Sequence, residues 1–133
     1  MLDPMLALVL WTFVMWLWMY AVRLPAMRAA GIDPARIKRP GDLDTLPIHA
    51  QQVADNYNHL HEQPVLFYAL VTYCHLTGAV DSTNVTLAWS YVVIRVAHSI
   101  VQSTFNFVPV RFAVFSLGSI VLFAIGLRAL LAS

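Results

Sequence analysis

The sequence predicts an all-α integral membrane protein whose chain forms a single bundle of four helices. Hydrophobic residues make up 59% of the chain and charged residues only 11%, whereas a soluble domain averages about 25% charged residues. Four predicted helices follow one another, each long enough to cross the ~30 Å hydrocarbon layer of a bilayer, and all but the first half of the second are largely apolar. The 133 residues suit one domain, and no basic run indicates a nucleic-acid partner.

The first predicted helix covers about residues 4–27. The run from Met5 to Val22 is apolar apart from Thr12, and it is long enough to span a membrane. No basic residue precedes this run and no small-residue cleavage site follows it, so we expect a retained membrane helix rather than a signal peptide. The polar loop that follows, residues 28–47, contains five helix breakers: Gly31, Pro34, Pro40, Gly41 and Pro47.

The second predicted helix, residues 48–76, has two unlike halves. Residues 48–63 are polar and amphipathic, whereas residues 64–76 are apolar. Pro64 removes one backbone hydrogen bond and predicts a kink between the halves. The apolar half alone is too short to cross the bilayer, so part of the polar half is expected at membrane depth, enclosed by protein.

The third and fourth predicted helices, residues 85–108 and 110–131, complete the bundle. A turn at Gly78 precedes the third helix, and Pro109 predicts a tight turn before the fourth. The lone cysteine, Cys74, lies in an apolar stretch, which favours a buried structural thiol, and an intrachain disulfide is excluded.

The third helix carries a stripe of polar residues at three- and four-residue steps: Arg95, His98 or Ser99, Gln102 and Asn106. This spacing puts them on one face of the helix. An ionisable residue inside a membrane helix costs roughly 2.5–3.5 kcal/mol on insertion scales, so it normally faces protein or enclosed water and marks function. The stripe therefore predicts a polar interior.

Two further polar groups are expected at the same end of the bundle. Arg111 stands where the fourth helix begins, and the polar half of the second helix has one face formed by Asp55, Asn58 or His59, and Glu62. Together with the stripe, these groups predict a buried acid–base cluster. Two interpretations stay open: an ion pair between Glu62 and Arg95 that fixes helix packing, or a pocket that binds a ligand.

A metal site is the alternative for part of this cluster. The candidate ligands are His59, His61, Glu62 and His98. His59 and His61 are two residues apart on a helix and point to nearly opposite faces, so we expect no native metal. No Gly-x-Ser-x-Gly motif and no glycine-rich phosphate loop occurs, which leaves nucleophilic catalysis by serine without support.

Three segments of the chain resemble the MAPEG family, the membrane-associated proteins of eicosanoid and glutathione metabolism. They are Asn58 to Phe67 (NHLHEQPVLF), Trp89 to His98 (WSYVVIRVAH) and Arg111 with Phe112. The family typically has Asn-x-x-Glu-x-x-Pro on its second helix and an Arg followed by Tyr residues on its third. The resemblance covers nearly the whole chain. It implies a bacterial-type homotrimer of four-helix subunits, with glutathione between neighbouring subunits near the cytoplasmic face.

The family's second-helix motif carries over in part. Asn58 matches the family Asn by its distance from Pro64. His61 then falls on the usual Glu position, and Glu62 lies one residue later. Ala54 stands where the family has an Arg one turn before the Asn.

The other helices supply the remaining matches. Arg95 matches the family Arg of the third helix, and His98 and Gln102 stand at the two Tyr positions that often serve glutathione. Arg111 resembles the Arg of the fourth helix that activates the thiol, with a turn two residues longer. Arg28 resembles the Arg of the first helix.

Two classes of function follow from the resemblance. The first is a glutathione-dependent transferase or peroxidase acting on hydrophobic electrophiles or lipid peroxides, in which Arg111 stabilises the thiolate and His98 gives or takes a proton. The residues expected to bind glutathione are Arg28, Asn58, Glu62, Arg95 and Gln102. The second is a non-catalytic membrane protein that binds a lipid, a small molecule or a partner membrane complex. The expected partners are the bilayer, a hydrophobic ligand and further copies of the chain.

The basic residues predict the orientation in the membrane. The end of the first helix and the first loop contain Arg23, Arg28, Arg36, Lys38 and Arg39, whereas the second loop has no basic residue. This bias predicts that the first and third loops lie in the cytoplasm and both termini on the other side of the membrane, which the bacterial-type resemblance implies is a bacterial inner membrane. A reporter that works only outside the cytoplasm should therefore be active when fused to the C-terminus. Activity of a cytoplasm-dependent reporter at the same position would overturn the topology.

Overall fold

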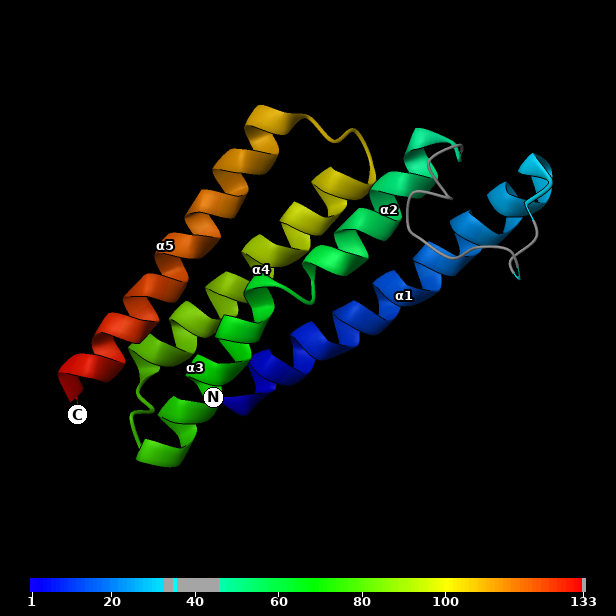
Figure 1. Ribbon diagram of the computed structural model, residues 1–133. Helices are drawn as coiled ribbons and strands as arrows, with labels where there is room; N and C mark the ends of the chain where they lie inside the picture. Colours follow the sequence, from blue (N-terminus) through cyan, green and yellow to red (C-terminus); the bar gives the residue numbers. More distant parts are fainter. Residues whose placement is uncertain (33–34, 36–45, 133) are drawn as a thin grey trace.

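The computed structural model describes residues 1–32, 35 and 46–132, and within them the chain is helical, with no strand. The helices are α1 (Leu2–Ala30), α2 (Ile48–His59), α3 (Gln63–Thr77), α4 (Ser82–Ser103) and α5 (Val108–Ala132). Both termini and the α3–α4 turn lie at one end of the bundle, and the α4–α5 connection lies at the other (Figure 1). The predicted basic and breaker residues Arg36, Lys38, Arg39, Pro34, Pro40 and Gly41 lie outside the described residues.

Three of the described helices, α1, α4 and α5, are long and apolar enough to cross a membrane. Large apolar side chains stay exposed on them, among them Leu17, Val93 and Phe123. Exposed apolar surface of this extent suits contact with lipid and not with water. The chain is therefore a multi-pass membrane protein. Helices α2 and α3 follow one another along the bundle, where α2 packs on α1 and α4, and α3 packs on α1 and α5 (Figure 1).

The segment expected to form one kinked second helix forms two separate helices instead. Residues 60–62 between them are held by short-range bonds, from Leu60 N to Asn56 O (3.0 Å) and from Glu62 N to His59 O (3.1 Å). Pro64 lies in the first turn of α3. A proline is tolerated there because the first N–H groups of a helix have no intrahelical partner. The break therefore places Glu62 and the start of α3 beside the middle of the bundle.

The turn before α5 also differs from the expectation. Pro109 does not form it but lies within the first turn of α5, and α4 ends at Ser103, earlier than predicted. The connection is made by residues 104–107, where Asn106 has a left-handed backbone (φ 47°) and its N–H donates to Val101 O (2.7 Å). Asparagine adopts this conformation more readily than most residues, which explains why a polar residue at this place turns the chain.

The apolar core lies between α1, α3, α4 and α5. Phe67 of α3 stacks on Tyr91 of α4 with ring centroids 4.8 Å apart, and both side chains are fully buried. Leu8 and Met15 of α1 pack into the same cluster. Cys74 is buried there too, as the sequence predicts. Close packing of these side chains fixes the distance between the helices.

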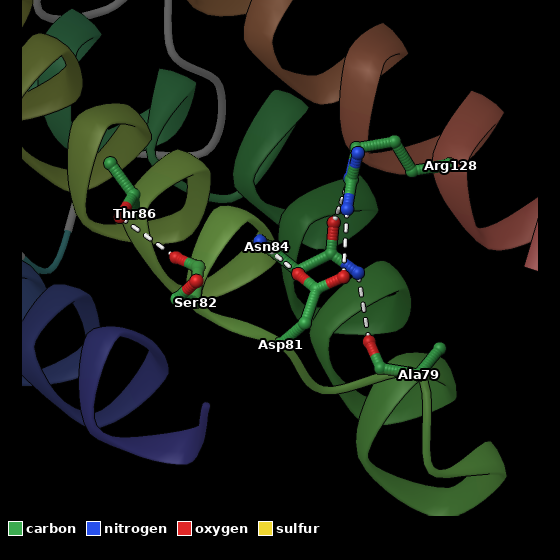
Figure 2. A network of polar contacts seen from close by, with 6 residues as sticks. All are labelled: Ala79, Asp81, Ser82, Asn84, Thr86 and Arg128. Atoms are coloured by element: carbon green, nitrogen blue, oxygen red, sulfur yellow. Dashed lines mark hydrogen bonds and ion pairs between the residues drawn. The ribbon is translucent and has the colours of Figure 1, made fainter.

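A polar clamp closes the end of the bundle near the termini (Figure 2). The Asp81 carboxylate accepts from Asn84 N (2.7 Å) and caps α4. Arg128 of α5 donates from Nη2 to Asp81 Oδ2 and from Nε to Asn84 Oδ1, both at 2.7 Å. Asn84 Nδ2 donates to Ala79 O (2.8 Å). The clamp ties the α3–α4 turn to the last turns of α5.

The clamp predicts a pH-dependent contribution to stability. The backbone hydrogen bond from Asn84, together with Arg128, holds the pKa of Asp81 below its ordinary value. A carboxyl group whose pKa is lower in the folded state stabilises the fold at pH values above its unfolded-state pKa of about 4. This stabilisation is lost as the pH falls through the folded-state pKa. Asp81→Asn keeps a capping side chain, so wild type should melt slightly higher than this variant near neutral pH and at the same temperature in acid.

Because the Asp81 and Arg128 side chains are solvated, the difference in melting temperature between wild type and Asp81→Asn should also shrink with added salt. A melting difference between wild type and Asp81→Asn that is the same at every pH and salt concentration would show that the carboxylate's charge contributes nothing.

Candidate functional site

A cavity of about 320 Å³ lies where the α2–α3 break faces α4 and the start of α5. Its polar wall consists of His59, Glu62, Gln63, Arg95, His98 and Arg111, and its apolar wall of Val108, Phe112 and Phe115. The volume is at the lower end of the roughly 300–1,000 Å³ that ligand pockets span. Both signs of charge meet in it, as the sequence predicts for the polar groups of the second, third and fourth helices.

Arg95 is the most deeply enclosed charge of this cavity. Its side chain is 2% exposed, and within the described residues its Nε and Nη2 have no hydrogen-bond partner. His98, one turn later, is 3% exposed, and its Nδ1 is likewise without a partner there. Buried polar groups are normally hydrogen-bonded, so donors of this kind indicate a bound ligand or water.

Arg111 is held by the turn that precedes its helix. Its Nη1 donates to Asn106 Oδ1 over 2.9 Å. Asn106 belongs to the predicted stripe, but it lies beyond the end of α4, so its role in the turn and in orienting Arg111 was not predicted. The only sequence signal for that role is an asparagine a few residues before a proline.

Gln63 joins three helices at the edge of the cavity. Its Nε2 donates to Ser119 Oγ of α5 (2.7 Å), and its Oε1 accepts from the Tyr91 hydroxyl of α4 (3.2 Å). No role for Gln63 was predicted from the sequence. Its place directly before Pro64, at the first residue of α3, was the signal that could have marked it.

His59 and Gln102 form a second bridge, between α2 and α4. The ring Nδ1 of His59 lies 3.1 Å from Gln102 Oε1 and 2.9 Å from Gln102 Nε2. Gln102 is 1% exposed and does not line the cavity. It therefore contacts the site through His59.

The structure brings together four of the predicted site residues: Glu62, Arg95, His98 and Arg111. It leaves Asn58 and Arg28 exposed and away from the cavity lining in the single chain. His61, at the family's Glu position, is exposed as well, and its Nδ1 lies 2.9 Å from Tyr57 O.

No salt bridge joins Glu62 to Arg95 among the described residues of the single chain, although both line one cavity, so their predicted interaction within or between subunits stays a prediction. The salt bridge found among the described side chains joins Arg128 to Asp81 instead. Glu62 is exposed at the rim, while Arg95 lies deep in the wall of the same cavity. In the described ranges, no group of three or more His, Cys, Asp or Glu side chains could hold a metal ion.

An apolar groove of about 570 Å³ adjoins the cavity between α3 and α5. Gln63 and Ser119 are its polar lining residues together with Tyr73, and the rest of the wall is formed by Leu66, Ala69, Leu70, Leu122 and Phe123. Gln63 lines both the groove and the cavity. A polar site and an apolar surface thus meet at one side chain.

Comparison with known families decides the assignment. The family model described as MAPEG family matches residues 1–131 of the chain. The chain belongs to the MAPEG family. A comparison with curated proteins and with solved structures gives no match. The resemblance drawn from the second- and third-helix segments is therefore confirmed, and the chain is a membrane protein of the glutathione and eicosanoid metabolism family.

The Gln63 bridge predicts a measurable loss of stability in one tyrosine variant. Tyr91→Phe removes the hydroxyl that donates to Gln63 and should lower the free energy of unfolding by about 0.5–1.5 kcal/mol, the usual value of one such bond. Tyr73→Phe is the matched control, because the Tyr73 hydroxyl makes no hydrogen bond in the described part of the chain and the side chain is 46% exposed. Denaturation of the detergent-solubilised proteins measures the free energy of unfolding of both variants. Equal stability of Tyr91→Phe and Tyr73→Phe would contradict the bridge.

Proposed function

We propose that this MAPEG protein binds glutathione in the cavity and uses its thiol on a hydrophobic electrophile or a lipid peroxide. The observation that supports the proposal most is one polar cavity holding two guanidinium groups, Arg95 and Arg111, beside an apolar groove that shares Gln63 with it. A polar thiol peptide suits the first compartment, and an apolar second substrate suits the other.

The charges of the cavity fit glutathione, which carries two carboxylates, one ammonium and one thiol. Arg95 offers buried donors that have no partner in the described residues, and these can bind a carboxylate. Glu62 at the rim can bind the ammonium. The remaining cation, Arg111, then lies free to act on the thiol.

Arg111 would favour the thiolate for two physical reasons. A guanidinium near a thiol stabilises the deprotonated form. Arg111 also stands in the first turn of α5, where the positive end of the helix dipole adds to its own charge. The hydrogen bond from Arg111 Nη1 to Asn106 keeps one side of the guanidinium occupied and fixes its plane. A histidine in the wall would take up or return the proton, and His98 is the one assigned from the sequence.

Arg28 and Asn58 fit this proposal only through a neighbouring copy. Both are exposed in the single chain. In the homotrimer that we propose by analogy with the family, they would meet the ligand across a subunit boundary, Arg28 at a carboxylate and Asn58 by hydrogen bonds. We also propose the orientation that the basic residues predict, in a bacterial inner membrane with both termini outside the cytoplasm.

The second substrate would enter from the bilayer. The groove between α3 and α5 is lined largely by aliphatic and aromatic side chains, and it is open at the lipid-facing side of helices with exposed apolar residues. An apolar molecule dissolved in the membrane would reach the cavity past Gln63 without crossing water.

A non-catalytic membrane protein remains the second candidate function. The exposure of Asn58 and His61, at positions that carry glutathione ligands in the family, favours it. Such a protein would use the cavity and groove to bind a lipid, a small molecule or a partner complex without turnover.

Arg111→Ala separates the two functions. For a thiol-using enzyme, millimolar glutathione should raise the melting temperature of the detergent-solubilised wild type by mass action, and bound glutathione should show thiolate absorbance in the ultraviolet. The variant should lose most of the thiolate signal with little change in its own melting temperature, since Arg111 lies at the helix start and its side chain donates, among the described residues, to Asn106 alone.

Arg23→Ala, a cation of α1 outside the cavity lining, is the matched control and should behave as wild type. A wild type without thiolate signal, or an Arg111→Ala variant with an undiminished one, would favour the non-catalytic function.

A further inference from the structure

His59 lies in the wall of the cavity, where the proposed function gives it no part. It is the last residue of α2, directly before the break, and its side chain is half-buried. It lines the same cavity as Arg111, Arg95 and His98. The family motif ascribes nothing to the residue after its Asn, and the sequence places His59 on the polar face of the second helix and among the candidate metal ligands without giving it a catalytic role.

The ring of His59 is oriented by a group that cannot titrate. Its Nδ1 meets the Gln102 amide, with 3.1 Å to Oε1 and 2.9 Å to Nε2. Gln102 is itself 1% exposed and packed in α4, so it cannot swing into solvent. When Oε1 accepts from Nδ1–H, the other ring nitrogen, Nε2, carries a lone pair. Nε2 makes no hydrogen bond within the described part of the chain.

The same amide oxygen serves the ring before and after it gains a proton. In the neutral tautomer with hydrogen on Nδ1, Oε1 accepts that hydrogen, and in the imidazolium it still does so. Protonation at Nε2 therefore breaks no contact between α2 and α4. A base arranged in this way can accept and return a proton without a change in its surroundings.

His98 is less suited to this role. Its side chain is 3% exposed, and its Nδ1 is buried without a partner among the described residues, so nothing fixes its tautomer. Its ring lies against Phe115 with centroids 6.1 Å apart. His59 is more accessible, and its Nδ1 contacts the Gln102 amide, so that its Nε2 can take a proton when Gln102 Oε1 accepts from Nδ1–H.

We infer that His59, oriented by Gln102, is the proton acceptor for the thiol that binds in the cavity; the inference rests on the proposed function. The thiol S–H bond breaks, its proton forms the N–H bond at His59 Nε2, and the electron pair stays on sulfur beside Arg111. When the sulfur forms its bond to a hydrophobic electrophile, His59 returns the proton to the group that leaves or to the oxygen of an opened ring. Gln102 is a positioning residue that acts through His59.

The charged and titratable groups around His59 are known from each packed element. Glu62 comes from the α2–α3 break, Arg95 and His98 from α4, and Arg111 from α5. None of the described lining residues comes from α1. The cations favour the thiolate, and they do not take its proton, since an arginine stays charged at any pH of interest. The proton must then go to a histidine, to Glu62 or to the medium.

The test compares two quantities when glutathione binds to the full-length protein in detergent. Ultraviolet absorbance gives the thiolate formed, and calorimetry in two buffers of different ionisation enthalpy gives the protons released to the medium. The measurement is made near pH 8, above the ordinary histidine pKa of about 6.5. If His59 keeps the proton, wild type releases fewer protons than the thiolates it forms.

His59→Gln should abolish this difference, so that the protons released equal the thiolates formed. His49→Gln is the matched control, because His49 is exposed on the same helix and outside the cavity lining; it should keep the wild-type difference. Gln102→Leu should reduce the difference, and Gln102→Glu, which retains an oxygen acceptor for Nδ1–H, should restore it.

Three results would overturn the assignment of His59. One is a wild type that releases as many protons as the thiolates it forms, a result that needs no variant to fold. Another is His59→Gln that binds glutathione and keeps the wild-type difference. The third is a difference that disappears in His98→Gln but not in His59→Gln. A wild type whose melting temperature does not respond to glutathione would instead overturn the proposed function itself.

Discussion

The enclosure of Arg95 is the constraint on which the rest of the site depends. A guanidinium in the middle of a membrane helix is costly unless protein, water or an anion surrounds it. The bundle encloses it almost completely, with 2% of the side chain exposed, yet leaves two of its nitrogens without a partner in the described residues. A charge that is desolvated without being paired is expensive. Because Arg95 lines the cavity, an anion that enters the cavity can form the charge pairing and hydrogen bonds that the described part of the chain does not supply.

The break between α2 and α3 makes the cavity possible. A continuous helix over residues 48–76 would distribute its polar residues along one face. The break at residues 60–62 instead brings His59, Glu62 and Gln63 to the wall of one cavity. Pro64 stabilises this arrangement, since its missing N–H costs nothing in a first helical turn. The polar residues then lie opposite α4, and Gln63 ties the break to α5 through Ser119.

The apolar packing of the bundle and its central polar stripe could be predicted from the sequence, because both depend on periodicity. Arg95, His98 and Gln102 recur at helical spacing, and the structure buries all three. The Glu62–Arg95 ion pair could not be judged in this way. Depth along two helices can be estimated from sequence, but the lateral position of Glu62 depends on a backbone break whose geometry is set by tertiary packing. The hydrogen bonds from Gln63 to Ser119 and between His59 and Gln102 could not be predicted for the same reason, because they depend on tertiary packing and join residues 56 and 43 positions apart.

We propose that the cavity walled by Arg95 and Arg111 binds an anionic thiol peptide. It is tested most directly by electron cryomicroscopy of the protein in lipid nanodiscs, with and without glutathione. We expect density in the cavity of the glutathione-treated sample that touches both guanidinium groups and is absent from the untreated one. The same density in both samples, or glutathione density elsewhere on the protein with none in the cavity, would contradict it.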